Sequence, residues 1–421
     1  MSTVPGDAAP QVAGSRRLVR SRQVDLVGTL LQRLPRADGA LAWLHDGVGL
    51  VGWGEAARLE VSGPDRFSQA REWWQALVST FDVADDVGVH GSGPVAFGSF
   101  AFSSSDDETS VLVVPEVILG RQAGTTWLTT VGELPRLASP DEVLAPGELR
   151  YAHGQLAVTD FSAAVAAAVA RIATGELDKV VLAHDLLAVA ERDIDVRFVM
   201  AGLTAANPGC WTYAVDGLVG ATPELLVSRQ GDRVVSRVLA GTTTRGRDDV
   251  DDHDRVEALL QSAKDLAEHR YAVESLVDAL APHVRDLDAA TTPHALGLSN
   301  VTHLATDVLA ELGDGSDVLD LVAALHPTAA VGGTPTDVAL GVLADLETMG
   351  RGRYAGPVGW VDARGDGEWG IALRCAQVTG RSARLFAGCG IVAGSDPDAE
   401  VLEAQAKFVP VRDALEGSAH G

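Results

Sequence analysis

The stretch of sequence that decides the fold lies near the C-terminus, between residues 351 and 407: RGRYAGPVGWVDARGDGEWGIALRCAQVTGRSARLFAGCGIVAGSDPDAEVLEAQAK. It contains three apolar runs of strand length, at 356–361, 369–378 and 383–387, which the glycine turns RGDG and TGRS separate. This pattern predicts a three-stranded antiparallel meander. A helix is expected after it, with Asp396 as the N-cap and Pro397 at the first helical position.

Charged side chains of that helix share one face, because Glu400, Glu403 and Lys407 are spaced at i, i+3 and i+7. Paired carboxylates suit a hard divalent cation. The alternative interpretation is an ordinary solvated helix face.

Groups that suit a carboxylate gather at one end of the expected meander. If each turn is centred on its glycines, Arg374 lies opposite residues 387–388, and Tyr354 lies at the same end of the sheet. A guanidinium and the bare amides of the segment 388–390 (Gly-Cys-Gly) can hold a substrate carboxylate. A surface arginine is the alternative for Arg374 taken alone.

Composition excludes several classes of partner. The chain has 421 residues, and its formal net charge of −25 makes nucleic acid or an acidic membrane a poor partner. The cysteines, Cys210, Cys375 and Cys389, form no disulfide or metal pattern, which fits a reducing compartment. No apolar run approaches the ~20 residues of a membrane span. We therefore expect a cytoplasmic protein that binds neither nucleic acid nor membrane.

The chain divides into three expected parts. Residues 1–20 contain arginines but no apolar signal core, and we expect a disordered tail there. Residues 21–150 are rich in predicted strands and poor in titratable residues at useful spacing, which favours a scaffold role. The motifs that carry chemistry fall in residues 151–415.

Lys179 opens a run, LDKVVLAH at 177–184, that is apolar on both faces and is typical of a buried strand. Its amine either reaches out to solvent along its aliphatic stem or is desolvated and able to act as a base. Both interpretations stay open at this point.

Glu224 lies in the segment TPELL at 222–226, between two expected strands. Hairpin counting across the turn QGD places it opposite about Val238, close to Gly241 and Thr242. A glycine there lets a ligand approach the backbone. The alternative is an ordinary exposed acid in a turn.

A continuous helix is expected at 255–280, because leucines and a valine recur every seven residues. Asp265 and Glu268 share a face of this helix and are a second source of metal carboxylates; alone they are more typical of solvated charges. A strand expected at 300–306 holds His303, and a lone histidine is more often packed than catalytic.

These motifs together resemble the chorismate-utilising enzymes, which include isochorismate, salicylate, anthranilate and aminodeoxychorismate synthases. The resemblance is strongest over 177–407, and the motifs stand in the family's order: LDKVVLAH, TPELL, LAGTTTRG, KDLAEH, HPTAAVGGTP, GRYAGPVGW, IALRCAQ, AGCGIVAGSDPDAE and a final E-x-x-E-x-x-x-K. No one motif is specific, whereas the ordered set is.

The resemblance implies one large α/β (α+β) domain with two stacked, mainly antiparallel β-sheets flanked by helices. It also implies Mg²⁺, held by Glu268 and Glu403 with Asp265 and Glu400 as close or water-mediated partners. The metal would hold the ring carboxylate of chorismate. The remaining substrate contacts would come from Arg374, Tyr354, Gly388, Gly390, Gly241, Thr242, His303 and Lys407.

Lysine at position 179 resembles the water-activating members of the family. The resemblance then implies an isochorismate synthase in which Lys179 is the base and Glu224 the acid, for menaquinone or, alternatively, siderophore synthesis. A salicylate synthase, an ammonia-using member and a catalytically silent homologue remain as alternatives. The family includes monomers, so we expect a monomer, with a weak homodimer as the alternative.

Some residues depart from the family pattern. His184 stands where arginine is common and could alter the field at Lys179. Cys389 replaces a usual alanine, and Pro410 should kink the last helix.

Overall fold

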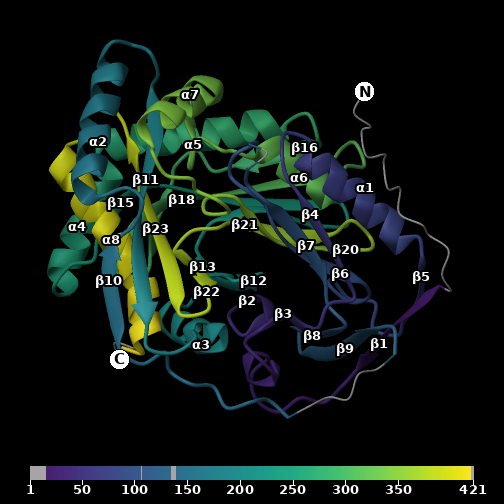
Figure 1. The fold of residues 1–421 in the computed structure, drawn as a ribbon. Coiled ribbons are helices and arrows are strands. Elements are labelled where there is room, and N and C mark those ends of the chain that lie inside the picture. Colours follow the sequence, from purple (N-terminus) through teal and green to yellow (C-terminus); the bar gives the residue numbers. More distant parts are fainter. Residues whose placement is uncertain (1–15, 106, 134–138, 419–421) are drawn as a thin grey trace, which may run out of the picture.

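The structure is a computed structural model, and it describes residues 16–105, 107–133 and 139–418. The described residues form two large sheets with helices around them (Figure 1). All strand pairs are antiparallel except β1 with β5, which is parallel. This arrangement confirms the predicted fold class.

The first sheet contains 13 strands, with β19 (Gly333–Thr334) attached to β11. Its order is β10 (Leu149–His153), β11 (Lys179–Ala190), β23 (Ser382–Ile391), β22 (Cys375–Thr379), β13 (Leu218–Thr222), β12 (Trp211–Val215), β2 (Leu41–His45), β3 (Val48–Trp53), β8 (Val117–Gln122), β9 (Thr125–Val131), β1 (Arg17–Gln23) and β5 (Phe81–Asp85).

The second sheet contains 10 strands, with β17 (His294–Gly297) attached to β18. Its order is β16 (Val284–Ala289), β18 (Val301–Leu312), β15 (Arg233–Thr244), β14 (Leu225–Gln230), β21 (Gly367–Ile371), β20 (Pro357–Asp362), β6 (Val95–Ser99), β7 (Ser110–Val114) and β4 (Ala57–Val61).

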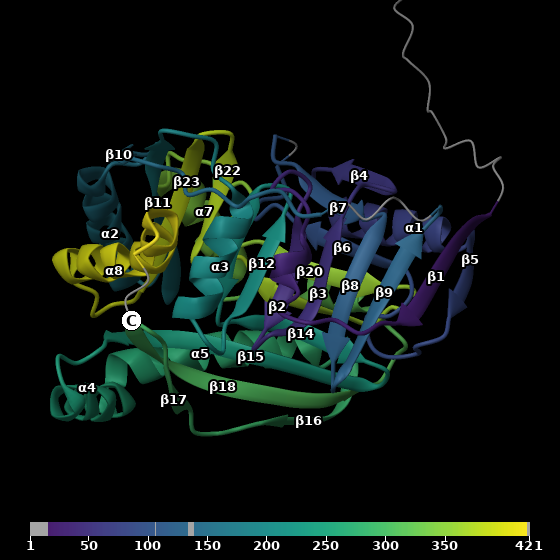
Figure 2. The same ribbon diagram turned by 90° about the horizontal axis from the view of Figure 1, so that it is seen from below.

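Helices cover the outer faces of the two sheets. In Figure 1, α2 and α8 lie side by side next to β11 and β23, and Figure 2 shows α5 along β15 and β18. The helices are α1 (Arg66–Val78), α2 (Val158–Ala173), α3 (Val196–Ala206), α4 (Asp249–Gln261), α5 (Ala263–Leu280), α6 (Val318–Leu325), α7 (Thr336–Leu346) and α8 (Pro397–Glu416), with a 3₁₀ turn at η1 (Leu31–Arg33). No helix in the described ranges has the length and apolar character needed to cross a membrane.

Large aromatic side chains fill the space between the sheets. Trp43 and Tyr213 of the first sheet and Phe97 and Trp369 of the second are fully buried. The Trp43 indole N–H donates to Glu368 across the gap at 2.8 Å. The core therefore ties the N-terminal strands to the C-terminal ones in one body.

The predicted meander at 356–387 is wrong. The single strand expected at 369–378 is two strands in different sheets: β21 pairs with β20 in the second sheet, and β22 pairs with β23 in the first. The chain crosses between the sheets at Arg374, whose φ of +47° ends the extended conformation. The register Ala376↔Leu385 still agrees with the hairpin counting that set Arg374 against 387–388.

Two other predictions differ from the structure. The helix expected at 255–280 is interrupted at Ser262, which caps α5 by accepting from the Asp265 N–H. Strand β1 begins at Arg17, inside the expected tail, because it pairs with both β5 and β9; residues 1–15 of that prediction lie outside the described residues. Pro410, where a kink was expected, lies inside helix α8, which continues to Glu416.

Candidate active site

A pocket lies where β11 and β23 of the first sheet approach β15 and β18 of the second, beside α5. The residues predicted for the site that line it are Glu224, Gly241, Thr242, Glu268, His303, Tyr354, Arg374, Gly388, Gly390 and Lys407. All of its lining residues lie between Val181 and Lys407. Because the chain crosses from the second sheet to the first at Arg374, both Arg374 and the end of β23 (Gly388 and Gly390) reach this pocket.

Arg374 is held in the pocket at the cost of a left-handed backbone conformation, which costs a non-glycine residue roughly 1–2 kcal/mol. Its guanidinium donates to His303 Nε2 at 3.0 Å. Because that nitrogen accepts, a neutral His303 carries its proton on Nδ1 and donates it to Thr242 Oγ1 at 3.0 Å. Burial and the Arg374 charge lower the pKa of His303 well below its ordinary value. His303 is therefore a neutral residue that positions Arg374.

The backbone amides of Gly388 and Gly390 face away from β11. Gly388 pairs with Ala183, but the Ala183 N–H donates to Glu347 Oε1 at 2.8 Å, so this is a pair without mutual hydrogen bonds. Gly390, two residues on, has the same orientation. The pairing with β22 ends at Leu385, and no strand of the described chain pairs with this edge of β23 beyond it. Two amides are thus available for an anion.

Lys179 is the first residue of β11 and is 0% exposed, which excludes a side chain that reaches solvent. Its Nζ lies 3.2 Å from Glu268 Oε1 on α5. A Cβ at position 390 would overlap the Glu268 carboxylate, so Gly390 leaves room for this ion pair beside the strand. The amine is therefore desolvated and aimed at the pocket wall.

Glu224 lies between β13 and β14 and is 4% exposed. The β14–β15 register places it opposite Leu239, one residue from the predicted Val238. Burial raises its pKa to about 8, although the nearby charges of Lys179 and Arg374 favour the carboxylate. Glu224 therefore carries a proton at neutral pH.

Tyr354 packs its ring flat against Phe386 of β23, with ring centroids 5.0 Å apart. Burial raises the pKa of its hydroxyl to about 12, so the group is a neutral donor. A Cβ at position 388 would lie 3.2 Å from this hydroxyl, which places the donor next to the free amides.

Helix α8 begins as predicted, with the Asp396 side chain accepting from the Ala399 N–H at 2.9 Å. Its carboxylates are paired with lysines: Glu403 with Lys407 at 2.6 Å, and Glu400 with Lys264 at 2.9 Å. Lys407 Nζ also donates to the Gly388 carbonyl at 2.9 Å, which ties the helix to the edge of β23.

The predicted metal ligands are all carboxylates, and hard oxygen donors of this kind suit Mg²⁺. Glu268 comes from α5 and lies against Gly390, and Glu400 and Glu403 come from α8 and lie near Cys389. Asp265 packs against Gly241 and is farther from this set. The structure thus brings three of the four predicted ligands to neighbouring residues of β23.

Arg351 was not among the predicted site residues. It is buried in the pocket wall, forms a two-bond ion pair with Glu347 (2.6 and 2.8 Å) and donates to the Val181 carbonyl at 2.6 Å. Two signals were available, its place at the start of the C-terminal motif and its i, i+4 spacing from Glu347, whereas its contact with Val181 cannot be counted from strand spacing.

His184 faces away from Lys179, since the two are five residues apart on one strand. Its ring stacks on Phe161 of α2 at 4.6 Å and meets Phe408 of α8 edge-on at 5.0 Å. Burial lowers its pKa to about 4. A neutral, packed ring adds no charge to the field at Lys179.

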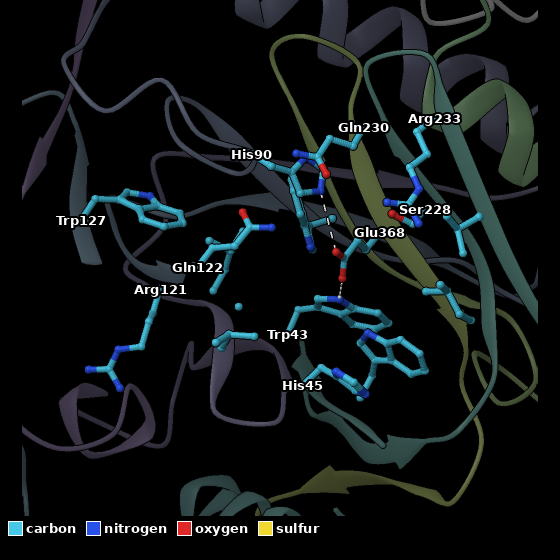
Figure 3. Close-up of a pocket in the computed structure, with 17 residues that line it drawn as sticks. Trp43, His45, His90, Arg121, Gln122, Trp127, Ser228, Gln230, Arg233 and Glu368 are labelled. Atoms are coloured by element: carbon cyan, nitrogen blue, oxygen red, sulfur yellow. Dashed lines mark hydrogen bonds and ion pairs between the residues drawn. The ribbon is translucent and has the colours of Figure 1, made fainter. Parts of the chain in front are cut away.

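A second cavity, of about 280 Å³, lies between the sheets and contains none of the predicted site residues (Figure 3). It is lined by Trp43, Trp127 and His90, and Figure 3 shows the Glu368 carboxylate between Trp43 and His90. The acid–base side chains of its described lining are His45, His90 and Glu368, of which Glu368 accepts from Trp43, and this lining contains no lysine and no second carboxylate. The chemistry therefore points to the first pocket.

Comparisons with known proteins show the family to which the chain belongs. The family described as chorismate binding enzyme matches residues 43–416. Isochorismate synthase DhbC of Bacillus subtilis is 38% identical over 321 residues, which cover 68% of this chain and 81% of that protein. Isochorismate synthase MenF of the same organism is 31% identical over 402 residues, which cover 87% and 85%.

Solved structures share the fold. MenF, the menaquinone-specific isochorismate synthase of Escherichia coli, superimposes with a TM-score of 0.79 at 26% identity, over 95% of this chain and 94% of that one. Anthranilate synthase component I of Streptococcus pneumoniae shares the fold with a TM-score of 0.67 at 19% identity, over 86% of this chain and 91% of that one. From the motifs, the pocket and these matches, the chain belongs to the chorismate binding enzyme family.

Proposed function

We propose that this protein is an isochorismate synthase, which converts chorismate to isochorismate with Mg²⁺. One observation carries the proposal: Glu224, a carboxyl group that burial keeps protonated, lines the pocket, and the buried amine of Lys179 lies behind its wall, 3.2 Å from the lining residue Glu268 and near enough for its charge to act on Glu224. Moving a hydroxyl group around a ring needs both a base for the incoming water and an acid for the departing group. The relatives named above support the same reaction.

Lys179, as the free amine, takes a proton from water while the water oxygen attacks C2 of the ring. The ring double bonds shift, and the C4–O bond breaks as Glu224 gives its proton to the leaving hydroxyl group. One water enters and one leaves, so the product is an isomer of the substrate. Proton exchange with solvent then restores the amine and the carboxyl group.

The substrate's enolpyruvyl carboxylate would be held by Arg374, the Tyr354 hydroxyl group and the amide of Gly388. The Arg374–His303–Thr242 chain fixes the guanidinium, so the carboxylate meets a donor that is already oriented. Gly241 and Lys407 would line the remaining surface.

Glu268 and Glu403 would hold Mg²⁺, with Glu400 and Asp265 as close or water-mediated partners. When bound there, the ion would hold the ring carboxylate and balance the surrounding negative charge.

The product assay tests this function. Purified protein is incubated with chorismate, with and without Mg²⁺, and the products are separated by HPLC. Isochorismate that forms only with Mg²⁺ is the expected result. Salicylate with pyruvate, a product that requires ammonia, or no turnover would each refute it.

We also propose a monomer that acts in the cytoplasm, with residues 151–415 as the catalytic region. Light scattering of the purified protein measures its molar mass and so tests whether it is a monomer.

Menaquinone synthesis is the proposed use of the product, and siderophore synthesis is the alternative. A deletion strain that fails to make menaquinone would support the first pathway.

A further inference from the structure

The thiol of Cys389 lies beside the carboxylates of Glu400 and Glu403, on the side of β23 that faces α8. Side chains alternate along a strand, so Cys389 points away from the face of Gly388 and Gly390. It is 1% exposed, and its Sγ donates to the backbone carbonyl of Glu400 at 3.2 Å. The proposed mechanism uses none of its atoms.

The ligand atoms of Cys389, Glu400 and Glu403 all lie within 4.8 Å of one another. Zinc bonds to sulfur at about 2.3 Å and to carboxylate oxygen at about 2.0–2.2 Å, which sets ligand atoms of one tetrahedral ion roughly 3.5 Å apart. Rotation of the two glutamate side chains covers this difference of about 1 Å. One thiol and two carboxylates can therefore hold one small cation without movement of the backbone.

Each of the two carboxylates, Glu400 and Glu403, is already paired with a lysine ammonium group. Lys264 pairs with Glu400 at 2.9 Å, and Lys407 pairs with Glu403 at 2.6 Å, so each ammonium group stands where a cation is favoured.

We propose that Cys389, Glu400 and Glu403 form a site for a thiophilic divalent cation, Zn²⁺ or Cd²⁺, and that this cation excludes Mg²⁺ by taking Glu403. On binding, a sulfur lone pair forms the metal–sulfur bond and the thiol proton leaves to solvent, with no change in oxidation state. Magnesium prefers oxygen and makes no use of the thiol. The competition with Mg²⁺ rests on the proposed function, whereas the thiolate site does not.

The first experiment adds Cd²⁺ alone to the full-length protein, without chorismate or Mg²⁺, and records the ultraviolet charge-transfer band of a cadmium–thiolate bond. Wild type and Cys389→Ala are compared with Cys375→Ala. Cys375 is a matched control, because it is also fully buried and its Sγ also donates to a backbone carbonyl, that of Ala372 at 3.6 Å.

We expect a band in wild type and in Cys375→Ala, and none in Cys389→Ala. A missing band in wild type, or a band that persists in Cys389→Ala, overturns the site. Circular dichroism checks that each variant folds, and Cys389→Ser replaces the alanine variant if that one does not. Because this measurement needs no turnover, its failure is distinct from failure of the proposed function.

The second experiment measures Zn²⁺ affinity by equilibrium dialysis and Zn²⁺ inhibition of isochorismate formation at several Mg²⁺ concentrations. Cys389→Ala should weaken Zn²⁺ binding at least about tenfold and should relieve inhibition to the same extent, while the Mg²⁺ affinity is kept. Equal Zn²⁺ binding and inhibition in both proteins would assign the effect to the carboxylates alone and refute a role for the thiol.

Discussion

Replacing Glu224 by glutamine should stabilise the protein while it removes activity. Glutamine has nearly the same shape but is neutral at every pH, so it cannot give a proton to the leaving group. Loss of a general acid lowers kcat by about 10²- to 10⁴-fold. The stability effect follows from the pKa of the Glu224 carboxyl group, which burial raises from 4.5 to about 8.

A carboxyl group with a raised folded-state pKa destabilises the fold as the pH rises, because the folded protein binds a proton that the unfolded chain releases. Each pKa unit corresponds to 1.36 kcal/mol. The cost of burying Glu224 is then about 1 kcal/mol at pH 5 and about 3 kcal/mol at pH 7, and it levels off above pH 8 at roughly 5 kcal/mol. Glutamine avoids this cost.

Urea unfolding at pH 5, 6, 7 and 8 measures the effect as the difference in midpoint between Glu224→Gln and wild type. Any hydrogen bonds that the glutamine amide cannot replace change the midpoint by the same amount at every pH. The diagnostic quantity is therefore the increase of the midpoint difference between the two proteins as the pH rises. A difference that stays constant from pH 5 to pH 8 would show that the Glu224 pKa is ordinary and would refute the assignment of Glu224 as the acid.

Three further substitutions test the site. Lys179→Ala should lower kcat by about 10²- to 10⁴-fold and keep chorismate binding in calorimetry, since the amine is assigned to chemistry; near-native turnover would contradict that role. Glu403→Gln should raise the Mg²⁺ concentration for half-maximal activity at least about tenfold, and an unchanged metal dependence would exclude ligation. Arg374→Ala should lower kcat/KM about 10- to 150-fold through the loss of a charged hydrogen bond worth about 1.5–3 kcal/mol, chiefly in KM; a change in kcat alone would place Arg374 elsewhere.

The sequence predicted the fold class and many element boundaries because strand and helix periodicity are local. The strand predicted to hold His303 at 300–306 is the first half of β18, and helix α8 begins at Pro397 with Asp396 as its N-cap, as predicted. The prediction failed at Arg374, where a non-glycine residue adopts a left-handed backbone that no local rule anticipates. It failed again at Ser262, where a serine that caps a new helix lies inside an unbroken heptad pattern.

Most of the candidate site could be predicted because the motif residues are few and chemically distinct. Their mutual pairing could not, since it depends on contacts between elements far apart in the chain. The ion pair of Lys179 with Glu268 joins β11 to α5, and the hydrogen bond from Arg351 to the Val181 carbonyl ties the C-terminal motif to β11. Burial, which decides that Glu224 holds a proton, is likewise a property of the folded protein.

The two lysine–carboxylate pairs of α8, Lys264 with Glu400 and Lys407 with Glu403, make metal and substrate binding interdependent. Each carboxylate that turns to a cation releases an ammonium group, and chorismate brings two carboxylates that such groups attract. Linkage requires the effect to be reciprocal, so chorismate should tighten Mg²⁺ binding by the same factor by which Mg²⁺ tightens chorismate binding. Neither ligand alone should bind well, and this heterotropic cooperativity would keep the site closed to other small anions when the cation is scarce.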